Sequence, residues 1–241
     1  MGESFSGQEF PDSWPGHLWL EGRTIVHLKD GQERPTHMPR GPAAKSGTGF
    51  MNPAMAPART RSILLLQDAL KHGWLNGNRP IRYLDALCAT GIRVRRWKNE
   101  IESNLLSRLH ITANDLDVNA LDWAIHSIHS DVLNDASFLP DDEQDLPNFI
   151  ERNGIRFQHC DARLAMVQGS FQCIDVDPFG SPISFIDGAL QALGRAGVLE
   201  VTATDTAALT GSSASSGKRR YGHKGIVDFY AHDDAVRVLL G

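Results

Sequence analysis

Apolar and polar residues alternate with two different periods along most of this chain. From about residue 80, short apolar runs are separated by longer segments in which apolar residues recur at helical spacing. The short runs predict strands at 82–86, 110–114, 156–160, 171–176 and 197–202. The amphipathic segments predict helices at 91–104, 118–130, 162–167, 181–193 and 224–240. Strands that alternate with helices are typical of βαβ units, so the pattern predicts an α/β fold with a doubly wound, mostly parallel sheet.

The first 50 residues lack this regular pattern and are rich in Gly, Pro, Ser and His. They predict a partly irregular arm with a short hairpin that turns near Gly22, and a helix follows at 53–72 with Asn52 as its N-cap. We therefore expect an N-terminal arm, 1–50, and a Rossmann-like domain, 51–241. The last predicted helix has the pattern of one that returns to feed another strand. We expect the domain to be truncated at its C-terminal end, lacking its last strands.

The charge is unevenly distributed along the chain. The formal net charge of −5 argues against a uniformly basic nucleic-acid coat. Nevertheless the stretch 34–61 holds five Lys or Arg and no acid, and 131–145 holds acids without a base. A second basic cluster consists of Lys218, Arg219, Arg220 and Lys224. Local basic patches can bind phosphate even on an acidic protein, and a solvated face is the alternative.

The three cysteines, Cys88, Cys160 and Cys173, lie in apolar surroundings and match no zinc-binding spacing. They indicate buried thiols in a reducing compartment, so we expect a cytoplasmic protein without a metal site. No apolar run approaches the length of a membrane span, and the N-terminus lacks the character of a signal or transit peptide. We expect no membrane association, and nothing in the sequence predicts a protein partner.

In a doubly wound sheet, ligands bind beyond the carboxyl ends of the strands. The first predicted strand is followed by Asp85-Ala-Leu-Cys-Ala-Thr-Gly91-Ile-Arg93. This loop has one glycine instead of the GxGxxG pattern, so binding of a dinucleotide pyrophosphate loses its main support. Its small residues still let a ligand approach the backbone. Arg93, in the first turn of the next helix, could pair with a carboxylate.

Acids also follow the second and third strands. Asp115 and Asp117 follow the second, where an acid can accept both hydroxyls of a ribose. Asp161 follows the third and precedes Ala162, where a carboxylate and a backbone N–H can read an adenine edge. Each acid taken singly is equally consistent with an N-cap of the following helix. Together, and without a phosphate loop, they indicate a nucleoside ligand, of which S-adenosylmethionine is the commonest cofactor.

The fourth predicted strand ends in Asp177-Pro178-Phe179-Gly180. An acid, a neighbouring carbonyl and an aromatic ring can grip the exocyclic amine of a nucleobase: the oxygens accept its N–H groups while the ring stacks on the base. A strand followed by a proline-glycine turn is the structural alternative. Asp175 shares a side of the strand with Asp177 by alternation, and the pattern leaves open whether it is buried or faces the ligand.

Several segments together resemble the tRNA (guanine(26)-N2)-dimethyltransferases, enzymes that transfer methyl groups from S-adenosylmethionine to a guanine amine in tRNA. The resemblance runs from about residue 50 to 241 and is carried by 51–59, 85–93, 114–116, 177–182 and 201–206. It implies a Rossmann-like methyltransferase fold. It implies that the cofactor is held by Arg59, Arg93, Asp115, Asp161 and Ala162. It also implies that the guanine is held by Asp177, Pro178 and Phe179.

The chain departs from the family pattern in places. Ala54 stands where the family usually has an arginine, which bears on one phosphate or cofactor contact, and Cys88 replaces a usual serine. The segment 212–218 is an unfamiliar, glycine-serine-rich version of a loop. Family members also continue into a tRNA-binding C-terminal domain, which we expect this chain to lack.

The resemblance predicts mono- and then dimethylation of the N2 amine of guanine 26 in tRNA, with tRNA as the partner. Asp177 and the Pro178 carbonyl are expected to accept the N2 hydrogens, with Phe179 stacked on a guanine that has left its helix. Two alternatives remain open from the residues alone. One is a non-catalytic or incomplete nucleoside- or RNA-binding module. The other is an amino-methyltransferase for another base or a protein side chain.

Overall fold

A computed structural model describes residues 17–28, 51–128, 150–152 and 154–240. Within the N-terminal segment, β1 (His17–Glu21) and β2 (Thr24–Leu28) form an antiparallel hairpin that turns at Gly22, as the sequence predicts. The rest of the predicted arm, the basic stretch 34–50 and the acidic stretch 131–145 lie outside the described residues. The division into an arm and a domain therefore stays a prediction.

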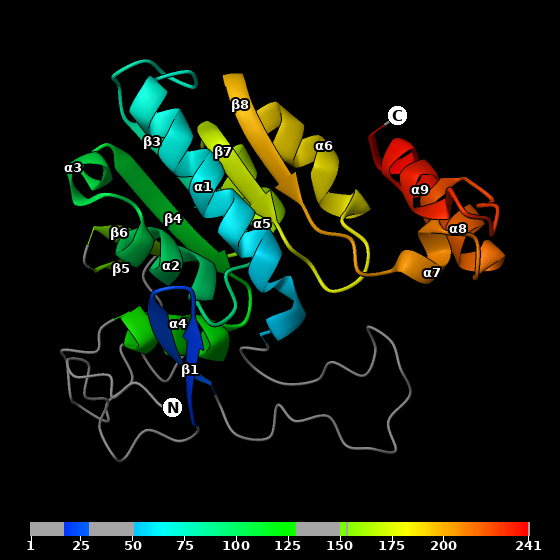
Figure 1. Ribbon diagram of the computed structural model, residues 1–241, viewed down its shortest axis with the longest axis horizontal. Helices are drawn as coiled ribbons and strands as arrows, with labels where there is room; N and C mark the ends of the chain where they lie inside the picture. The colour runs from blue at the N-terminus through cyan, green and yellow to red at the C-terminus, as the bar shows by residue number, and fades with distance from the viewer. Residues whose placement is uncertain (1–16, 29–50, 129–149, 153, 241) are drawn as a thin grey trace.

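The main sheet has six strands in the order β5-β6-β4-β3-β7-β8. All neighbours are parallel except the edge pair β5–β6. The strands are β3 (Ile81–Asp85), β4 (Leu109–Asp115), β5 (Ile150–Arg152), β6 (Ile155–His159), β7 (Phe171–Val176) and β8 (Leu193–Val201). This arrangement confirms the predicted doubly wound, mostly parallel sheet (Figure 1).

Helices cover both faces of the sheet. One face packs against α1 (Ala56–His72), α2 (Ile92–Glu100) and α4 (Val118–Ile128), and the other against α5 (Ala162–Val167) and α6 (Ile183–Ala192). The sequence predicts a helix at 53–72 capped by Asn52. Asn52 does accept from the backbone N–H of Ala54, but it caps the short 3-10 turn η2 (Pro53–Met55), and α1 begins only at Ala56. The remaining helices are α3 (Ser103–Leu106), α7 (Thr206–Leu209), α8 (Ala214–Tyr221) and α9 (Ala231–Leu240). The last three lie beyond β8, to one side of the sheet (Figure 1).

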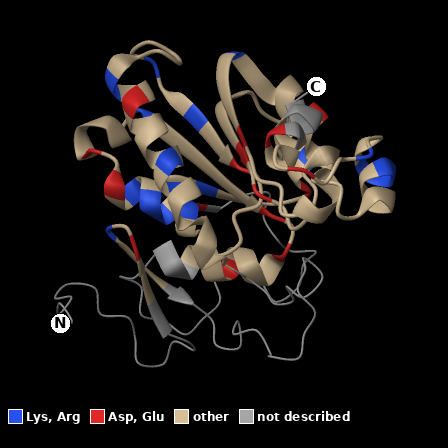
Figure 2. Ribbon diagram, turned by 45° about the vertical axis from the view of Figure 1, so that its right-hand side comes forward, with Lys and Arg blue, Asp and Glu red and all other residues tan. Residues whose placement is uncertain are grey.

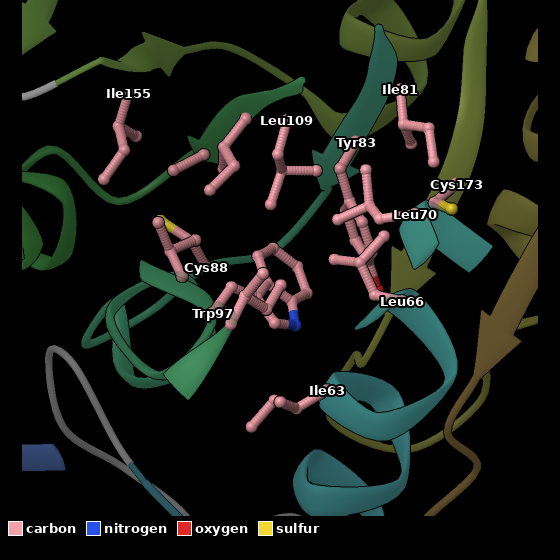
Figure 3. Close-up of a cluster of buried hydrophobic side chains, with 14 of the residues drawn as sticks. Ile63, Leu66, Leu70, Ile81, Tyr83, Cys88, Trp97, Leu109, Ile155 and Cys173 are labelled. Atoms are coloured by element: carbon pink, nitrogen blue, oxygen red, sulfur yellow. The ribbon is translucent and has the colours of Figure 1, made fainter. Parts of the chain in front are cut away.

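The two faces of β3 feed two separate cores because successive side chains of a strand point to opposite sides. Tyr83 packs with Leu66 of α1 and Trp97 of α2 in the larger core (Figure 3). Leu84 packs with residues of α5 and α6 in the smaller core. The rings of Tyr83 and Trp97 lie with centroids 3.8 Å apart. This three-layer packing holds the carboxyl ends of the central strands rigidly in place.

The structure also corrects several predicted boundaries. The helix predicted at 91–104 is two helices, because the extended backbone of Ile101 interrupts it. The last strand begins at Leu193 instead of 197, and β5 adds an antiparallel edge strand that the pattern does not predict.

The region after β8 differs most from expectation. The glycine-serine-rich segment is helical from Ala214, whereas 224–230 is not helical and α9 begins only at Ala231. A Cβ on Gly225 would lie 2.6 Å from the backbone nitrogen of Gly211. The close approach of these two glycines joins the segment to the loop after α7, and this tertiary contact overrides the local helical pattern.

Candidate functional site

The order of the parallel strands reverses at β3, with β4 and β6 on one side and β7 and β8 on the other. Ligands of doubly wound sheets bind at this switch point, beyond the carboxyl ends of the strands. A cavity of about 430 Å³ lies there. Its lining includes Arg59, Asp85, Thr90, Arg93, Asp115, Asp175, Asp177, Pro178, Phe179 and Thr204.

The loop after β3 is folded around the end of β4. Asp115 Oδ2 accepts from the backbone N–H of Ala89 at 2.8 Å, and its Oδ1 accepts from the N–H of Asp117 at 2.9 Å. Ala89 and Gly91 both have positive φ, at 46° and 70°. Gly91 adopts this conformation at little cost because it lacks a Cβ. These turns bring the backbone of the loop close to the cavity and fix the Asp115 carboxylate at its wall.

Asn114 connects the same loop to the next strand. Its side-chain N–H groups donate to the carbonyls of Ala86 and Cys160, both at 3.0 Å, and the thiol of Cys160 donates back to its Oδ1. The residue is fully buried. The side-chain amide of Asn114 therefore connects the carboxyl ends of three neighbouring strands, β3, β4 and β6.

Arg93 is the central cation of the cavity. Its Nε lies 2.8 Å from Asp175 Oδ2 in an ion-pair contact that lacks hydrogen-bond alignment, and its Nη2 donates to Asp177 Oδ2 at 3.3 Å. Its Nη1 lies 3.6 Å from Glu200 Oε2. Burial alone would lower the pKa of Arg93, but Asp175 beside it reverses the effect and the net pKa is raised. The guanidinium therefore stays charged and organises three carboxylates from two strands.

Two of the surrounding acids are buried. Burial raises the pKa of Asp85 to about 7; Arg93 opposes this rise, and Asp177 adds to it. Burial raises the pKa of Asp175 as well, against the effect of Arg93. Asp85 Oδ2 has no hydrogen-bond partner within the described chain, and neither does the buried hydroxyl of Thr90. The cavity thus presents polar atoms whose hydrogen-bonding capacity the described protein residues leave unused.

The Asp177–Gly180 loop is fastened to the segment after β8. The backbone N–H of Gly180 donates to Thr204 Oγ1 at 2.8 Å, and the N–H of Thr204 donates to the Gly180 carbonyl at 2.9 Å. Gly180 has a φ of 88°, which a side chain would strain. Pro178 is buried beneath the loop, whereas Phe179 is 56% exposed. An apolar ring held in water next to a carboxylate is suited to stacking on a planar ligand.

Arg59 also lines the cavity, and its guanidinium already has partners within the protein. It donates from Nε and Nη2 to the two oxygens of Glu21 in the hairpin, at 2.7 and 2.5 Å, and from Nη2 to the Asn52 carbonyl at 3.0 Å. Glu21 also accepts from Arg96 at 3.0 Å. Both members of the Arg59–Glu21 pair are buried, so this contact fixes the hairpin against α1 and positions Arg59 at the cavity.

Comparison with known proteins identifies the family. The chain matches the family described as "TRM: N2,N2-dimethylguanosine tRNA methyltransferase" over residues 31–241. The chain belongs to this family. It is 34% identical over 194 residues to the tRNA (guanine(26)-N(2))-dimethyltransferase of Methanobrevibacter smithii, covering 80% of this chain and 43% of that protein. The human protein of the same name is 32% identical over 160 residues, covering 66% of this chain and 22% of its own length.

A solved structure of a TRM-family protein supports the same assignment. The chain is similar to Trm1 from Pyrococcus horikoshii in complex with S-adenosyl-L-methionine, with a TM-score of 0.66 and 27% sequence identity. The match covers 93% of this chain and 52% of that one. The chain therefore spans about half the length, or less, of these three TRM-family relatives.

The structure gathers most of the predicted site residues of this TRM-family chain. Arg59, Arg93 and Asp115, predicted for the cofactor, line the same cavity as Asp177, Pro178 and Phe179, predicted for the base. Asp115 and Asp177 thus share one cavity although 62 positions separate them in the sequence. Their individual roles stay predictions.

Asp161 and Ala162 are not among the residues that line the cavity. They follow β6, one strand further along the same edge of the sheet. Asp161 caps α5 through the N–H of Arg163 at 2.8 Å and also pairs with the Arg163 guanidinium at 2.6 Å. These bonds lower the pKa of Asp161 to about 2. In this structure the N-cap alternative accounts for its contacts, as it does for Asp117 at the start of α4.

Sequence reasoning gave no role to Asp85 and Thr204 and left the position of Asp175 open. Asp85 could have been singled out because it ends a predicted strand in the same way as Asp115. Thr204 lies in the 201–206 motif of the TRM family, but only the fold shows that it holds the Asp177–Gly180 loop. Asp175 is buried and lines the cavity, so it is both a core residue and a neighbour of the site.

Proposed function

We propose that this chain carries the S-adenosylmethionine-dependent methyltransferase site of a tRNA guanine-N2 methyltransferase. The observation that carries the proposal is the convergence of Asp115 and Asp177 on one cavity at the switch point of a TRM-family sheet. The relatives are named for dimethylation of guanine 26, and one, from Aquifex aeolicus, for guanines 26 and 27. We propose guanine 26 in tRNA as the substrate, modified first once and then twice.

The residues of the cavity fit the cofactor. Its volume of about 430 Å³ falls within the range of small-molecule sites. S-adenosylmethionine carries an amino group, a carboxylate, ribose hydroxyls and an adenine. The unsatisfied Asp85 Oδ2 and Thr90 Oγ1 are an acceptor and a donor–acceptor for such polar groups. In the proposal, Asp115 receives the ribose, Arg59 and Arg93 provide positive charge, and Asp161 with Ala162 lies toward the adenine. The cofactor supplies an electrophilic methyl group.

The chain's own residues act on the guanine amine. Asp177 accepts one N2–H and the Pro178 carbonyl accepts the other, which directs the nitrogen lone pair away from both acceptors. Phe179 stacks on the base and holds its plane. Positioning of this kind can supply on the order of 7–11 kcal/mol of the barrier reduction. Proton acceptance contributes about 10²–10⁴-fold in rate.

Arg93 links the two halves of the proposed site. It contacts Asp177, the proposed amine acceptor, and Asp175 in the strand below it. The guanidinium therefore fixes the direction of the Asp177 carboxylate before the base arrives. A preoriented acceptor costs little reorganisation in the transition state, which is the main electrostatic advantage of an enzyme site.

The guanine must leave its base stack to reach Asp177, which costs a few kcal/mol. Binding of the tRNA backbone offsets this cost. Cytoplasmic action is part of the proposal, and the cysteines of the chain, free and with Cys88 and Cys173 buried, agree with a reducing compartment. Among the described residues, no helix is long and apolar enough to cross a membrane.

The test measures cofactor binding and methyl transfer separately. Isothermal titration of the chain with S-adenosylmethionine is followed by transfer of tritiated methyl groups to an unmodified tRNA transcript. We expect Asp177→Asn to keep cofactor affinity within about threefold and to lower transfer by about 10²-fold or more. Asp187→Asn, an exposed substitution on α6 outside the cavity, is the matched control.

Each alternative gives its own result. Cofactor binding by the wild-type chain without transfer to tRNA favours a nucleoside-binding module. Transfer to another base or to a protein identifies a different amino-methyltransferase. Transfer by Asp177→Asn at the wild-type rate shows that the reaction does not need the Asp177 carboxylate as a proton acceptor.

A further inference from the structure

Helix α8 and the turn after it present a cluster of exposed cations. The cluster consists of Lys218, Arg219 and, just after the helix, Lys224. No acid within the described part of the chain forms an ion pair with any of the three. Figure 2 shows basic positions of this helix at the edge of the molecule, beyond the last strand of the sheet. We call Lys218, Arg219 and Lys224 the α8 basic surface.

The α8 basic surface is rigidly joined to the candidate site. Tyr221, at the end of α8, donates its hydroxyl to Asp205 at 2.7 Å, and the same hydroxyl lies 2.6 Å from Ser181 Oγ. Arg220 pairs with Asp205 at 2.9 Å. Ser181 lines the cavity and directly follows the Asp177–Gly180 loop. One side chain of α8 therefore touches the rim of the proposed guanine pocket.

Close packing against α7 adds to this attachment. Gly217 of α8 is buried, and a Cβ at this position would lie 2.7 Å from the carbonyl oxygen of Ala208. Only a glycine lets the two helices approach so closely. The position of α8 relative to the cavity is thus set by hydrogen bonds on one side and by backbone packing on the other.

We propose that the α8 basic surface docks the sugar-phosphate backbone of the RNA whose guanine enters the cavity. The proposal rests on the proposed function and adds to it the surface that holds the substrate. The chain as a whole is negatively charged, so its attraction to RNA must come from local patches of cations. Lys218, Arg219 and Lys224 form such a patch, and Tyr221 connects it to the rim that the flipped base must cross.

The positive charge of the α8 basic surface favours RNA as its binding partner. Phosphates repeat along a nucleic-acid strand, and each Lys or Arg that neutralises one releases counterions, which gives affinity without sequence preference. Such contacts fix register and orientation, and leave recognition of the base to the pocket. This division of roles matches a basic helix that is hydrogen-bonded to the edge of a cavity lined by Asp177 and Phe179.

The experiment measures RNA affinity without methyl transfer. Fluorescence anisotropy of a labelled, unmodified tRNA transcript gives Kd for the chain at salt concentrations from about 50 to 200 mM. The variant is K218Q/R219Q/K224Q. The matched control is R79Q/R82Q/R195Q, which removes three exposed charges at or near the amino-terminal ends of β3 and β8, the opposite edge of the sheet. Cofactor affinity is measured on every sample.

The docking proposal predicts how Kd and its salt dependence change in each variant. The α8 variant should bind the tRNA on the order of tenfold or more weakly at about 50 mM salt, and its log–log salt slope should fall by about two to three. The control should keep the wild-type slope, and both variants should keep wild-type cofactor affinity. An α8 variant with the wild-type Kd and slope overturns the proposal, and so does an equal loss in the control.

The outcomes separate this proposal from the proposed function. A wild-type chain that binds tRNA through α8 but transfers no methyl group supports the docking surface and contradicts the methyltransferase assignment. If the wild-type chain transfers methyl groups and the α8 variant binds tRNA normally, the methyltransferase assignment is supported and the docking surface is contradicted. Self-association abolished by K218Q/R219Q/K224Q, with tRNA affinity unchanged, overturns the docking proposal and assigns the surface to a second copy of the chain.

Discussion

Asp85 of β3 and Asp175 of β7 are register partners in the sheet, and both carboxyl groups are buried where they line the candidate cavity. Two acids side by side in a low-dielectric interior cannot both ionise without a compensating charge. Arg93 supplies that charge for Asp175 at 2.8 Å. Burial still raises the pKa of both carboxyl groups against the effect of Arg93, and that of Asp85 rises to about 7.

This raised pKa predicts a pH-dependent stability. The pKa of Asp85 rises from its ordinary value of 3.8 to about 7 in the fold, so the folded state binds the proton more tightly than the unfolded state. Its contribution is fully present below about pH 4 and is lost as the pH rises through about 7. Asp85→Asn removes this dependence. The unfolding free energy of the variant minus that of the wild type should therefore rise by about 2–3 kcal/mol when the pH is raised from about 5 to about 8.

Urea denaturation of both proteins at the two pH values measures the effect. Asp187→Asn, an exposed substitution, serves as the control: its unfolding free energy should change between the two pH values as that of the wild type does. Parallel pH profiles for wild type and Asp85→Asn would show that Asp85 is ionised in the folded protein at the lower pH.

Phe179 should matter for substrate and little for stability. Its side chain is 56% exposed, so Phe179→Ala should change the unfolding free energy by no more than about 0.5 kcal/mol. Stacking of an aromatic ring on a base contributes about 1–3 kcal/mol, so kcat/KM for tRNA should fall about 5- to 150-fold. Phe179→Tyr should retain most of the activity because it keeps the ring. An unchanged kcat/KM for Phe179→Ala would assign this ring to some other contact.

Tyr221 should act as a positioning residue for the Asp177–Gly180 loop. Tyr221→Phe removes the hydroxyl that bonds Asp205 and contacts Ser181 but keeps the ring. We expect kcat for methyl transfer to fall about tenfold or more through misplacement of the loop, with cofactor affinity unchanged. The cost in stability should be about 1 kcal/mol.

Kinetics on tRNA and titration with S-adenosylmethionine separate this role from a structural one. Thr210→Val is a suitable control, because the Thr210 hydroxyl bonds the Thr206 carbonyl of the preceding helix turn, away from the loop. A Tyr221→Phe variant with normal kcat would mean that the contacts between Thr204 and Gly180 suffice to place the loop.

Glu21 should be essential for the attachment of the hairpin. It bonds Arg59 and Arg96 in a buried setting, and removal of its charge leaves a buried cation uncompensated. Glu21→Gln should therefore destabilise the chain by about 3–5 kcal/mol in chemical denaturation. Lys71→Met breaks the exposed Lys71–Glu102 pair and should cost less than about 1 kcal/mol. A similar small loss for Glu21→Gln would show that the hairpin is held by apolar contacts instead.

The elements that the sequence predicts correctly are those whose bounds depend on local sequence alone. Phe171–Val176 and Ala162–Val167 have the expected bounds because each is set by an apolar run or an amphipathic stretch between clear turn signals. The segment 224–230 was predicted wrongly, since Gly225 packs against Gly211 and the local pattern contains no trace of that contact. The edge strand β5 was missed because three residues are too few to show a period.

The sequence by itself determined the alternation of strands and helices, the acids at the strand ends and the family, because these depend on residue type and spacing. Tertiary structure decided what each acid does. Asp115 and Asp177 reach one cavity because β4 and β7 flank β3 in the sheet, whereas Asp161 turns to Arg163. Strand order and side-chain partners depend on contacts between distant segments, and such contacts arise only when the whole core packs.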